Sequence, residues 1–240
     1  MVTALVLSGG MGSRMGSDIP KQYIEVGGIP VISYCIKTLS ESDRIDAIWI
    51  VAATEWQENI HKWLSTSDLY DKFKGFSSPG ANRQMSVFNG ISDIKAMLSD
   101  TEYVLIHDAA RPMITAADIE NCMAAVSGHD GVLPVLPMKD TVYLSNDGTR
   151  VNGLLERNQV FAGQAPEVFV LDKYLRANES LIGNDKDGVS SPVLKINGST
   201  EPAIMAGMDI VMIPGNEDNF KITTMADLKR FEIIIEKGKS

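Results

Sequence analysis

The stretch VTALVLSGGMGSRMG, residues 2–16, joins a short apolar run to a glycine-rich turn, and this junction decides the fold. Residues 4–7 are uniformly apolar, as in a strand buried on both faces of a parallel sheet. Glycines in the turn let backbone N–H groups approach phosphate oxygens without side-chain interference. Arg14 and Lys21 supply positive charge nearby. The stretch predicts a phosphate site at the end of the first strand.

This loop differs from two common phosphate-binding patterns. A dinucleotide fingerprint starting at Gly10 needs a third glycine at the position of Met15, and no Gly-Lys-Ser/Thr follows as in a Walker loop. A plain strand-to-helix turn is the alternative interpretation of so many glycines. The nearby basic residues favour a nucleoside triphosphate held by the loop, with Ser8, Gly9, Gly10 and Gly12 as candidate binding residues.

Downstream of the loop, short apolar runs alternate with helical patterns. This alternation predicts one α/β domain over residues 1–240, with a Rossmann-like, mainly parallel sheet and helices on both faces. Ligands in such folds bind beyond the carboxyl ends of the strands. Strands are expected at 47–53, 73–76, 103–106, 131–136 and 208–213, and helices at 30–39, 55–64, 82–97, 115–126 and 223–235. Residues 184–201 are rich in Gly, Ser, Asn and Pro and are expected to form a loop.

Residues 138–161 interrupt this alternation. A strand at 140–144, a turn at 145–148 and a returning strand at 151–155 predict a β-hairpin inserted into the α/β domain. An isolated hairpin is marginal in water. We therefore expect this arm to pack on a second copy of the chain.

Composition excludes several classes of function. The 240 residues carry a formal net charge of −9, which disfavours sequence-independent binding of nucleic acid. No apolar run approaches the roughly 20 residues needed to span a bilayer, and no signal peptide is visible. Cys35 and Cys122 are far apart in the sequence and are expected to be free and buried. These features indicate a cytoplasmic protein.

The segment LIHDAARP, residues 105–112, places an acidic residue just beyond a buried strand. Asp108 there is suited to help hold Mg²⁺ near phosphates. A helix cap or a salt bridge with Arg111 is the alternative. The adjacent His107 should point to the opposite face of the strand, and we interpret it as structural.

Two further turns precede or follow helical patterns. In residues 80–87, backbone groups and Ser86 are candidates for reading a base edge, although Asn82 also suits a plain helix cap. Lys221 lies between an apolar strand and a helix that Thr224 can cap. A lone lysine is usually a solvated surface charge, but this position favours a role in a site.

Together these segments resemble the 2-C-methyl-D-erythritol 4-phosphate cytidylyltransferases and the related ribitol-5-phosphate cytidylyltransferases. The matching segments follow the family's order and cover nearly the whole chain: GGMGSRM (9–15), PKQY (20–23), NRQMSV (82–87), HDAARP (107–112), KDT (139–141), QAP (164–166) and NFKIT (219–223).

The resemblance implies transfer of CMP from CTP to a small alditol phosphate, with Mg²⁺ as cofactor and pyrophosphate as the leaving group. By the same resemblance, Arg14, Lys21 and Lys221 are the catalytic residues. The implied nucleotide-binding residues are Ser8, Gly9, Gly10, Gly12, Gly80, Arg83, Ser86, Asp108 and Ala109, with Asp108 also at the metal. Arg111, Thr141 and Arg157 are implied on the acceptor side. The family's arm crosses to a partner, so the arm at 138–161 implies a homodimer in which Arg157 completes the neighbouring site.

The identity of the acceptor stays open at this point. The family usually has Thr-Pro-Gln where this chain has APE at 165–167, and its acidic acceptor segment falls near residues 197–200, which lack acidic side chains. The segments at 108–111 and 139–141 look like the methylerythritol branch of isoprenoid synthesis. Trp56 and the GQ pair at 163–164 look like the ribitol branch of teichoic-acid synthesis. Another polyol or sugar phosphate, or a catalytically silent nucleotide-binding protein, are the alternatives.

Overall fold

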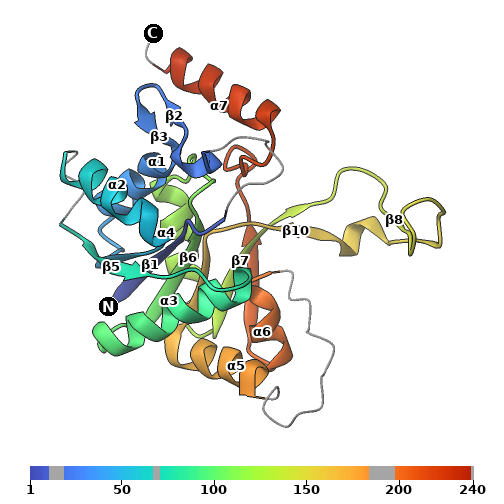
Figure 1. The fold of residues 1–240 in the computed structure, drawn as a ribbon. Coiled ribbons are helices and arrows are strands. Elements are labelled where there is room, and N and C mark those ends of the chain that lie inside the picture. The colour runs from blue at the N-terminus through green and yellow to red at the C-terminus, as the bar shows by residue number, and fades with distance from the viewer. Residues whose placement is uncertain (11–18, 67–70, 184–197, 239–240) are drawn as a thin grey trace.

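The computed structural model describes residues 1–10, 19–66, 71–183 and 198–238. Strand β1 (Val2–Leu7) lies inside a sheet, paired in parallel with β4 (Ala47–Val51) on one side and with β6 (Tyr103–Asp108) on the other. Leu7 pairs with Asp108 in this register, so β1 and β6 end side by side at the same edge of the sheet. Figure 1 shows the two strands next to each other.

The main sheet has eight strands in the order β10-β7-β11-β6-β1-β4-β5, and β12 also pairs with β7. Besides β1, β4 and β6, the sheet contains β5 (Phe73–Ser77), β7 (Gly131–Pro137), β10 (Phe161–Gly163), β11 (Glu167–Val170) and β12 (Ile210–Pro214). β11 runs antiparallel to β6 and β7, and β10 antiparallel to β7, whereas the other pairs are parallel. The predicted mainly parallel sheet is confirmed.

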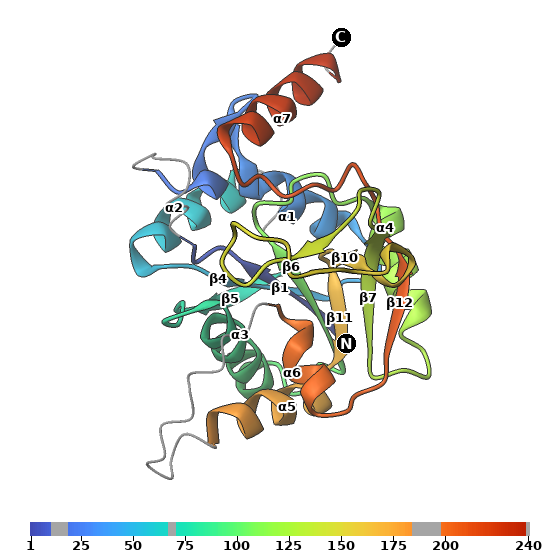
Figure 2. The same ribbon diagram turned by 90° about the vertical axis from the view of Figure 1, so that its right-hand side faces the viewer.

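Helices cover both faces of the sheet, as Figure 2 shows. The alternation along β1 assigns each face: Ala4 and Val6 pack in one core, and Leu5 packs in the other. The first core receives apolar side chains from α1 (Val31–Glu41), α2 (Thr54–Ser65) and α4 (Ala116–Ala125). The second core receives those of α3 (Arg83–Met97), α5 (Leu171–Gly183) and α6 (Thr200–Met205).

Local hydrogen bonds set where several helices begin. The Asn82 side chain accepts from the backbone N–H of Met85 at 2.9 Å and caps α3. Thr115 begins α4, and Thr224 begins α7 (Met225–Lys237); each forms a reciprocal capping box with an aspartate three residues later. The predicted caps at Asn82 and Thr224 are confirmed. α7 packs over the small β2–β3 sheet (Glu25–Val26, Ile29–Pro30) through a third apolar cluster.

The inserted hairpin projects from the body as an arm (Figure 1). Its strands are β8 (Tyr143–Leu144) and β9 (Gly153–Leu154), which pair with each other and form a separate two-stranded sheet. The expected loop at 184–201 is wrong at its end, because Thr200–Met205 is helical; residues 184–197 lie outside the described residues. Cys35 and Cys122 are free and buried, as expected. None of the helices in the described ranges has the length and apolarity needed to cross a bilayer.

Candidate active site

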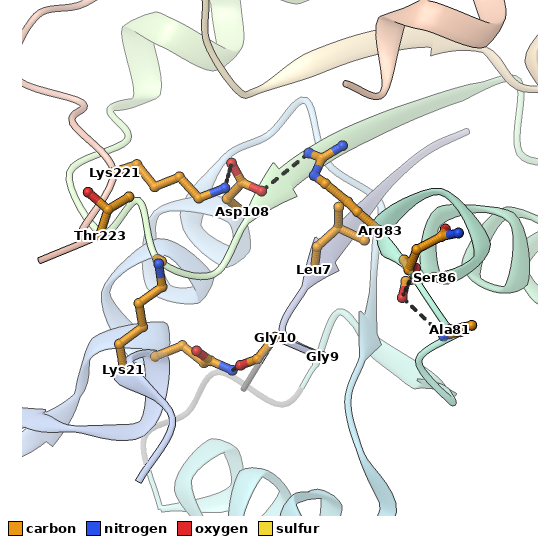
Figure 3. Close-up of a pocket in the computed structure, with 14 residues that line it drawn as sticks. Leu7, Gly9, Gly10, Lys21, Ala81, Arg83, Ser86, Asp108, Lys221 and Thr223 are labelled. Carbon is orange, nitrogen blue, oxygen red and sulfur yellow. Dashed lines mark hydrogen bonds and ion pairs between the residues drawn. The ribbon is translucent and has the colours of Figure 1, made fainter. Parts of the chain in front are cut away.

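A pocket of about 380 Å³ opens at the sheet edge where β1 and β6 end. Its size suits a nucleotide-sized ligand, since ligand pockets span about 300–1,000 Å³. The first turn of α3, the segment around Lys21 and the loop carrying Lys221 complete the walls (Figure 3). Eight residues expected from the sequence lie on these walls: Gly9, Gly10, Lys21, Gly80, Arg83, Ser86, Asp108 and Lys221.

Three cationic side chains converge on Asp108. Its Oδ2 accepts from Lys221 Nζ at 3.0 Å and from Arg111 Nε at 3.4 Å, and its Oδ1 accepts from Arg83 Nη2 at 3.3 Å. Burial alone would raise the pKa of Asp108, but Lys221, Arg83 and Arg111 outweigh it and hold that pKa well below its usual range. Asp108 is therefore ionised at neutral pH, and it holds cationic groups at the pocket wall.

The loop at the start of α3 is held by Ser86. Its hydroxyl oxygen accepts from the backbone N–H of Gly80 at 3.0 Å, and the hydroxyl donates to the carbonyl of Asn82 at 2.9 Å. A Cβ on Gly80 would lie 2.3 Å from that of Met85, so the loop can pack this closely only with glycine. Ser86 is thus a support of the loop, and the backbone of the loop lines the pocket.

Ser8 lies behind the pocket. Its hydroxyl donates to Tyr23 Oη at 2.7 Å, and it is 3% exposed. The Gln22 amide donates to the carbonyls of Ser8 at 2.7 Å and Gly10 at 2.9 Å. Tyr23 in turn stacks on Trp56, with ring centroids 4.2 Å apart. These contacts tie the short 3-10 turn Lys21–Tyr23 to the end of β1, so they set where Lys21 stands.

Arg111 and His107 hold the neighbouring loop. Arg111 Nη1 donates to the Asn219 carbonyl at 2.7 Å, two residues before Lys221, and the Arg111 side chain is only 12% exposed. His107 Nε2 lies 2.9 Å from the Arg111 carbonyl, and burial lowers the pKa of His107 to about 4. His107 is neutral at pH 7 and lies on the opposite side of β6 from Asp108, as the sequence pattern indicated.

Among the described residues, the other predicted site residues are not on the pocket wall. Ala109 is buried, with its N–H donating to the Leu7 carbonyl. Thr141 and Arg157 are exposed on the arm, where Arg157 Nη1 donates to the Lys139 carbonyl at 3.1 Å. Arg14 and Gly12 lie outside the described residues. Within one chain, the described acceptor-side residues of the arm are therefore separate from the pocket.

Sequence reasoning named no ligand-binding role for several wall residues: Leu7, Gln22, Ala81, Asn82, Ala110 and Thr223. Each lies inside or directly beside a motif quoted above, so position within the motif was the available signal. What the sequence lacked was the direction in which each side chain or backbone group points.

The donor set of the pocket suits a metal bound together with phosphates. No cluster of three or more His, Cys, Asp or Glu able to hold an ion occurs within the described ranges. Asp108 is the one carboxylate among the described wall residues. Mg²⁺ at nucleotide sites commonly takes one or two carboxylates and fills its shell with phosphate oxygens and water. Asp108 fits the role of the single carboxylate ligand.

The pocket combines glycines at its rim with ammonium and guanidinium groups pointing inward (Figure 3). Backbone N–H groups and fixed cations of this kind bind polyphosphates and stabilise negative charge that develops during phosphoryl transfer. The buried His107 is neutral and bonded elsewhere. The arrangement supports charge stabilisation and positioning as its chemistry.

Comparison with known proteins identifies a family that matches nearly the whole chain. The family model described as "IspD: 2-C-methyl-D-erythritol 4-phosphate cytidylyltransferase" matches residues 2–237. A 2-C-methyl-D-erythritol 4-phosphate cytidylyltransferase of Nitrosomonas eutropha is 33% identical over 239 residues, covering 98% of this chain and 96% of the relative. A ribitol-5-phosphate cytidylyltransferase of Streptococcus agalactiae serotype Ia is 27% identical over 237 residues, with 98% and 96% covered.

Solved structures share the fold. The crystal structure of 4-diphosphocytidyl-2C-methyl-D-erythritol synthase from Anaerococcus prevotii superposes with a TM-score of 0.81 at 22% identity, covering 98% of this chain and 96% of that one. A Francisella tularensis 2-C-methyl-D-erythritol 4-phosphate cytidylyltransferase gives a TM-score of 0.76 at 22% identity, with 97% and 98% covered. The match over residues 2–237 and the 33% identical relative show that this chain belongs to the IspD cytidylyltransferase family.

Proposed function

We propose that this chain transfers CMP from CTP to a small alditol phosphate, 2-C-methyl-D-erythritol 4-phosphate or D-ribitol 5-phosphate. Family membership supports the cytidylyl transfer. The observation that carries the proposal is the pocket in which Lys21, Arg83 and Lys221 surround the end of β6 at Asp108. Relatives named for each of the two acceptors cover 98% of this chain, which supports both acceptors as candidates.

In the proposed reaction, an oxygen of the acceptor phosphate attacks the α-phosphorus of CTP in line. The bond from the α-phosphorus to its bridging oxygen breaks, and pyrophosphate leaves with that electron pair. The acceptor oxygen is already anionic, so no strong general base is required. Lys21 and Lys221, with Arg14, stabilise the charge on the triphosphate and in the transition state.

The nucleotide lies, in this proposal, between the glycine-rich turn and the loop that starts α3. Gly9, Gly10 and Gly12 offer backbone N–H groups to phosphates, and Gly80 and the loop fixed by Ser86 face the cytosine and ribose. The described members of this set lie on the pocket wall. Ser8 and Ala109 act by holding the wall from behind.

We propose Mg²⁺ as the cofactor, held by Asp108 together with the triphosphate oxygens. When bound, it neutralises phosphate charge and orients the leaving group. Lys221, Arg83 and Arg111 keep the Asp108 carboxylate ionised, and the ionised carboxylate is the form that binds Mg²⁺.

We propose that the arm at 138–161 makes a homodimer and delivers Thr141 and Arg157 to the partner's acceptor site. Five large apolar side chains of the arm are exposed: Tyr143, Leu144, Val151, Leu154 and Phe161. A two-stranded hairpin with this surface gains stability by packing on another copy. The cytoplasmic location remains a prediction.

A nucleotide panel and an acceptor panel test the proposal. Thermal unfolding with CTP, UTP, GTP or ATP should show the largest rise in Tm with CTP, because only ligands of the folded state stabilise it. Pyrophosphate release with CTP should then require 2-C-methyl-D-erythritol 4-phosphate or D-ribitol 5-phosphate. Binding of CTP without turnover on either acceptor, or on other polyol phosphates, would support a catalytically silent protein instead.

A further inference from the structure

A carboxylate with one unpaired oxygen is buried behind the pocket wall. Glu167 begins β11 and is 8% exposed. Its Oε1 accepts a hydrogen bond from Thr200 Oγ1 at 2.9 Å, whereas its Oε2 forms no hydrogen bond of normal geometry with the residues that the structure describes. Burial raises the pKa of Glu167. An ionised carboxylate in such a place needs a compensating charge nearby.

Arg83 supplies that charge. Arg83 lowers the pKa of Glu167, and Glu167 in turn raises the pKa of Arg83. The two side chains form no direct ion pair within 4 Å, and both interact with the Ser199 side chain. Arg83 Nη1 donates to Ser199 Oγ, and Ser199 also lowers the pKa of Glu167.

The fold places Arg83 between two carboxylates. β11 runs antiparallel to β6, and Glu167 stands opposite Ile106, two residues before Asp108. Arg83 Nη2 reaches Asp108 Oδ1 on the pocket side (Figure 3). Its Nη1 donates to Ser199, which is fully buried. The Ser199 carbonyl accepts from Tyr174 Oη at 2.7 Å, which holds the serine in place from α5.

We propose that Glu167 is a positioning residue for Arg83. With Ser199, it holds the guanidinium from behind, so that Arg83 keeps its place in the pocket when Asp108 engages a ligand. Asp108 alone would leave Arg83 without an anionic partner whenever a cation or substrate group takes that carboxylate. The inference rests on the proposed function, in which the nucleotide occupies the pocket that Arg83 lines.

The variant Glu167→Gln tests the charge, because glutamine keeps an oxygen that can accept the Thr200 hydrogen bond. We expect Kd for CTP, measured by calorimetry, to rise about tenfold, within the usual range of coupling between interacting residues. Glu167→Asp keeps the charge and should recover part of the affinity. The matched control is Asp172→Asn, which removes an exposed carboxylate that pairs with Lys95, and it should leave Kd unchanged.

A double-mutant cycle separates positioning from a general structural role. In an Arg83→Met background, Glu167→Gln should have no further effect on Kd for CTP, because the group that it positions is gone. An equal loss in both backgrounds, or an unchanged or tighter Kd in Glu167→Gln alone, would overturn the proposal.

The same cycle, read by urea unfolding, does not depend on activity. Coupling between the two substitutions in the unfolding midpoint would support the Arg83–Glu167 pairing, and additive effects would refute it. If the wild-type protein binds no CTP, the proposed function fails, and this stability cycle still decides the relation between the two residues.

Discussion

At the scale of single residues, three cations share one carboxylate at Asp108. The sequence predicted a role for Asp108 from its place after an apolar strand, and a salt bridge to Arg111 as the alternative. Both are compatible with the structure, because Arg111 pairs with the residue that also faces the pocket. The contacts of Arg83 and Lys221 with it were not predictable, since those residues are 25 and 113 positions away.

Replacing Asp108 by asparagine should destabilise the protein. Asp108→Asn leaves three cationic groups without their anion, and breaking a buried ion pair on one side costs about 3 kcal/mol. Because its pKa is depressed in the folded state, the carboxylate contributes stability above its unfolded-state pKa, and this contribution is lost only as the pH falls through the folded-state value. Urea unfolding should therefore give the same loss from pH 6 to about pH 8.

The control for this change is Asp43→Asn, which removes an exposed carboxylate from the turn that follows α1. It should leave the free energy of unfolding within about 0.5 kcal/mol of the wild-type value. A loss in Asp108→Asn no larger than in Asp43→Asn would show that the three cations do not depend on Asp108.

Ser8 shows where residue-level prediction was incomplete. The sequence assigned it to the nucleotide, because it opens the glycine-rich turn. In the structure, the Ser8 hydroxyl donates to Tyr23 and the Ser8 carbonyl accepts from Gln22. A side chain at the end of a buried strand can face either the pocket or the core, and the sequence alone does not say which.

At the scale of elements, the start of α3 links local packing to the site. Gly80→Ala would place a Cβ 2.3 Å from Met85 Cβ and 2.9 Å from the Ser86 nitrogen. We expect a loss of stability of about 2 kcal/mol, as for overpacked sites, together with weaker CTP binding as the loop shifts. Thermal unfolding and calorimetry measure the two effects.

Gly198→Ala is the matched control, because a Cβ there meets nothing within 4 Å. It should change neither Tm nor CTP affinity appreciably. If Gly80→Ala behaves like Gly198→Ala, the tight packing at the start of α3 is not required for the pocket.

Helices and strands were predicted correctly where a capping residue or a turn residue marked their ends. Caps at Asn82 and Thr224 marked the starts of α3 and α7. The prediction failed at β11 and α5, because Leu171 begins the helix directly after Val170 ends the strand, with no turn residue between them. It also failed at α6, a short helix at the edge of a stretch rich in Gly and Ser.

At the scale of the whole molecule, the arm projects from the body of its own chain (Figure 1), and residues 138–161 are not on the wall of the pocket. The sequence predicted the arm from its change of pattern, and the fold confirms an inserted hairpin. Thr141 and Arg157 are exposed on this arm.

Mixing two inactive variants tests whether the arm serves a partner. Lys21→Ala should disable the pocket of its own chain, and Arg157→Ala should disable the neighbouring one. Hybrid dimers would then carry one intact site, so an equal mixture should recover about a quarter of wild-type activity after subunit exchange. Light scattering checks that both variants remain dimers. If an exchanged mixture recovers no activity, Arg157 acts in the site of its own chain or in neither site.

The most direct test of the account compares wild type with Lys21→Ala by ³¹P NMR, with CTP, Mg²⁺ and either alditol phosphate. The wild-type protein should form pyrophosphate and a CDP-alditol in equal amounts with one of the two acceptors. Lys21→Ala should remain folded and lose about 10²–10³-fold in kcat, as when one preorganised charge-stabilising group is removed. No CDP-alditol from the wild type with either acceptor, or full turnover by Lys21→Ala, would contradict the account.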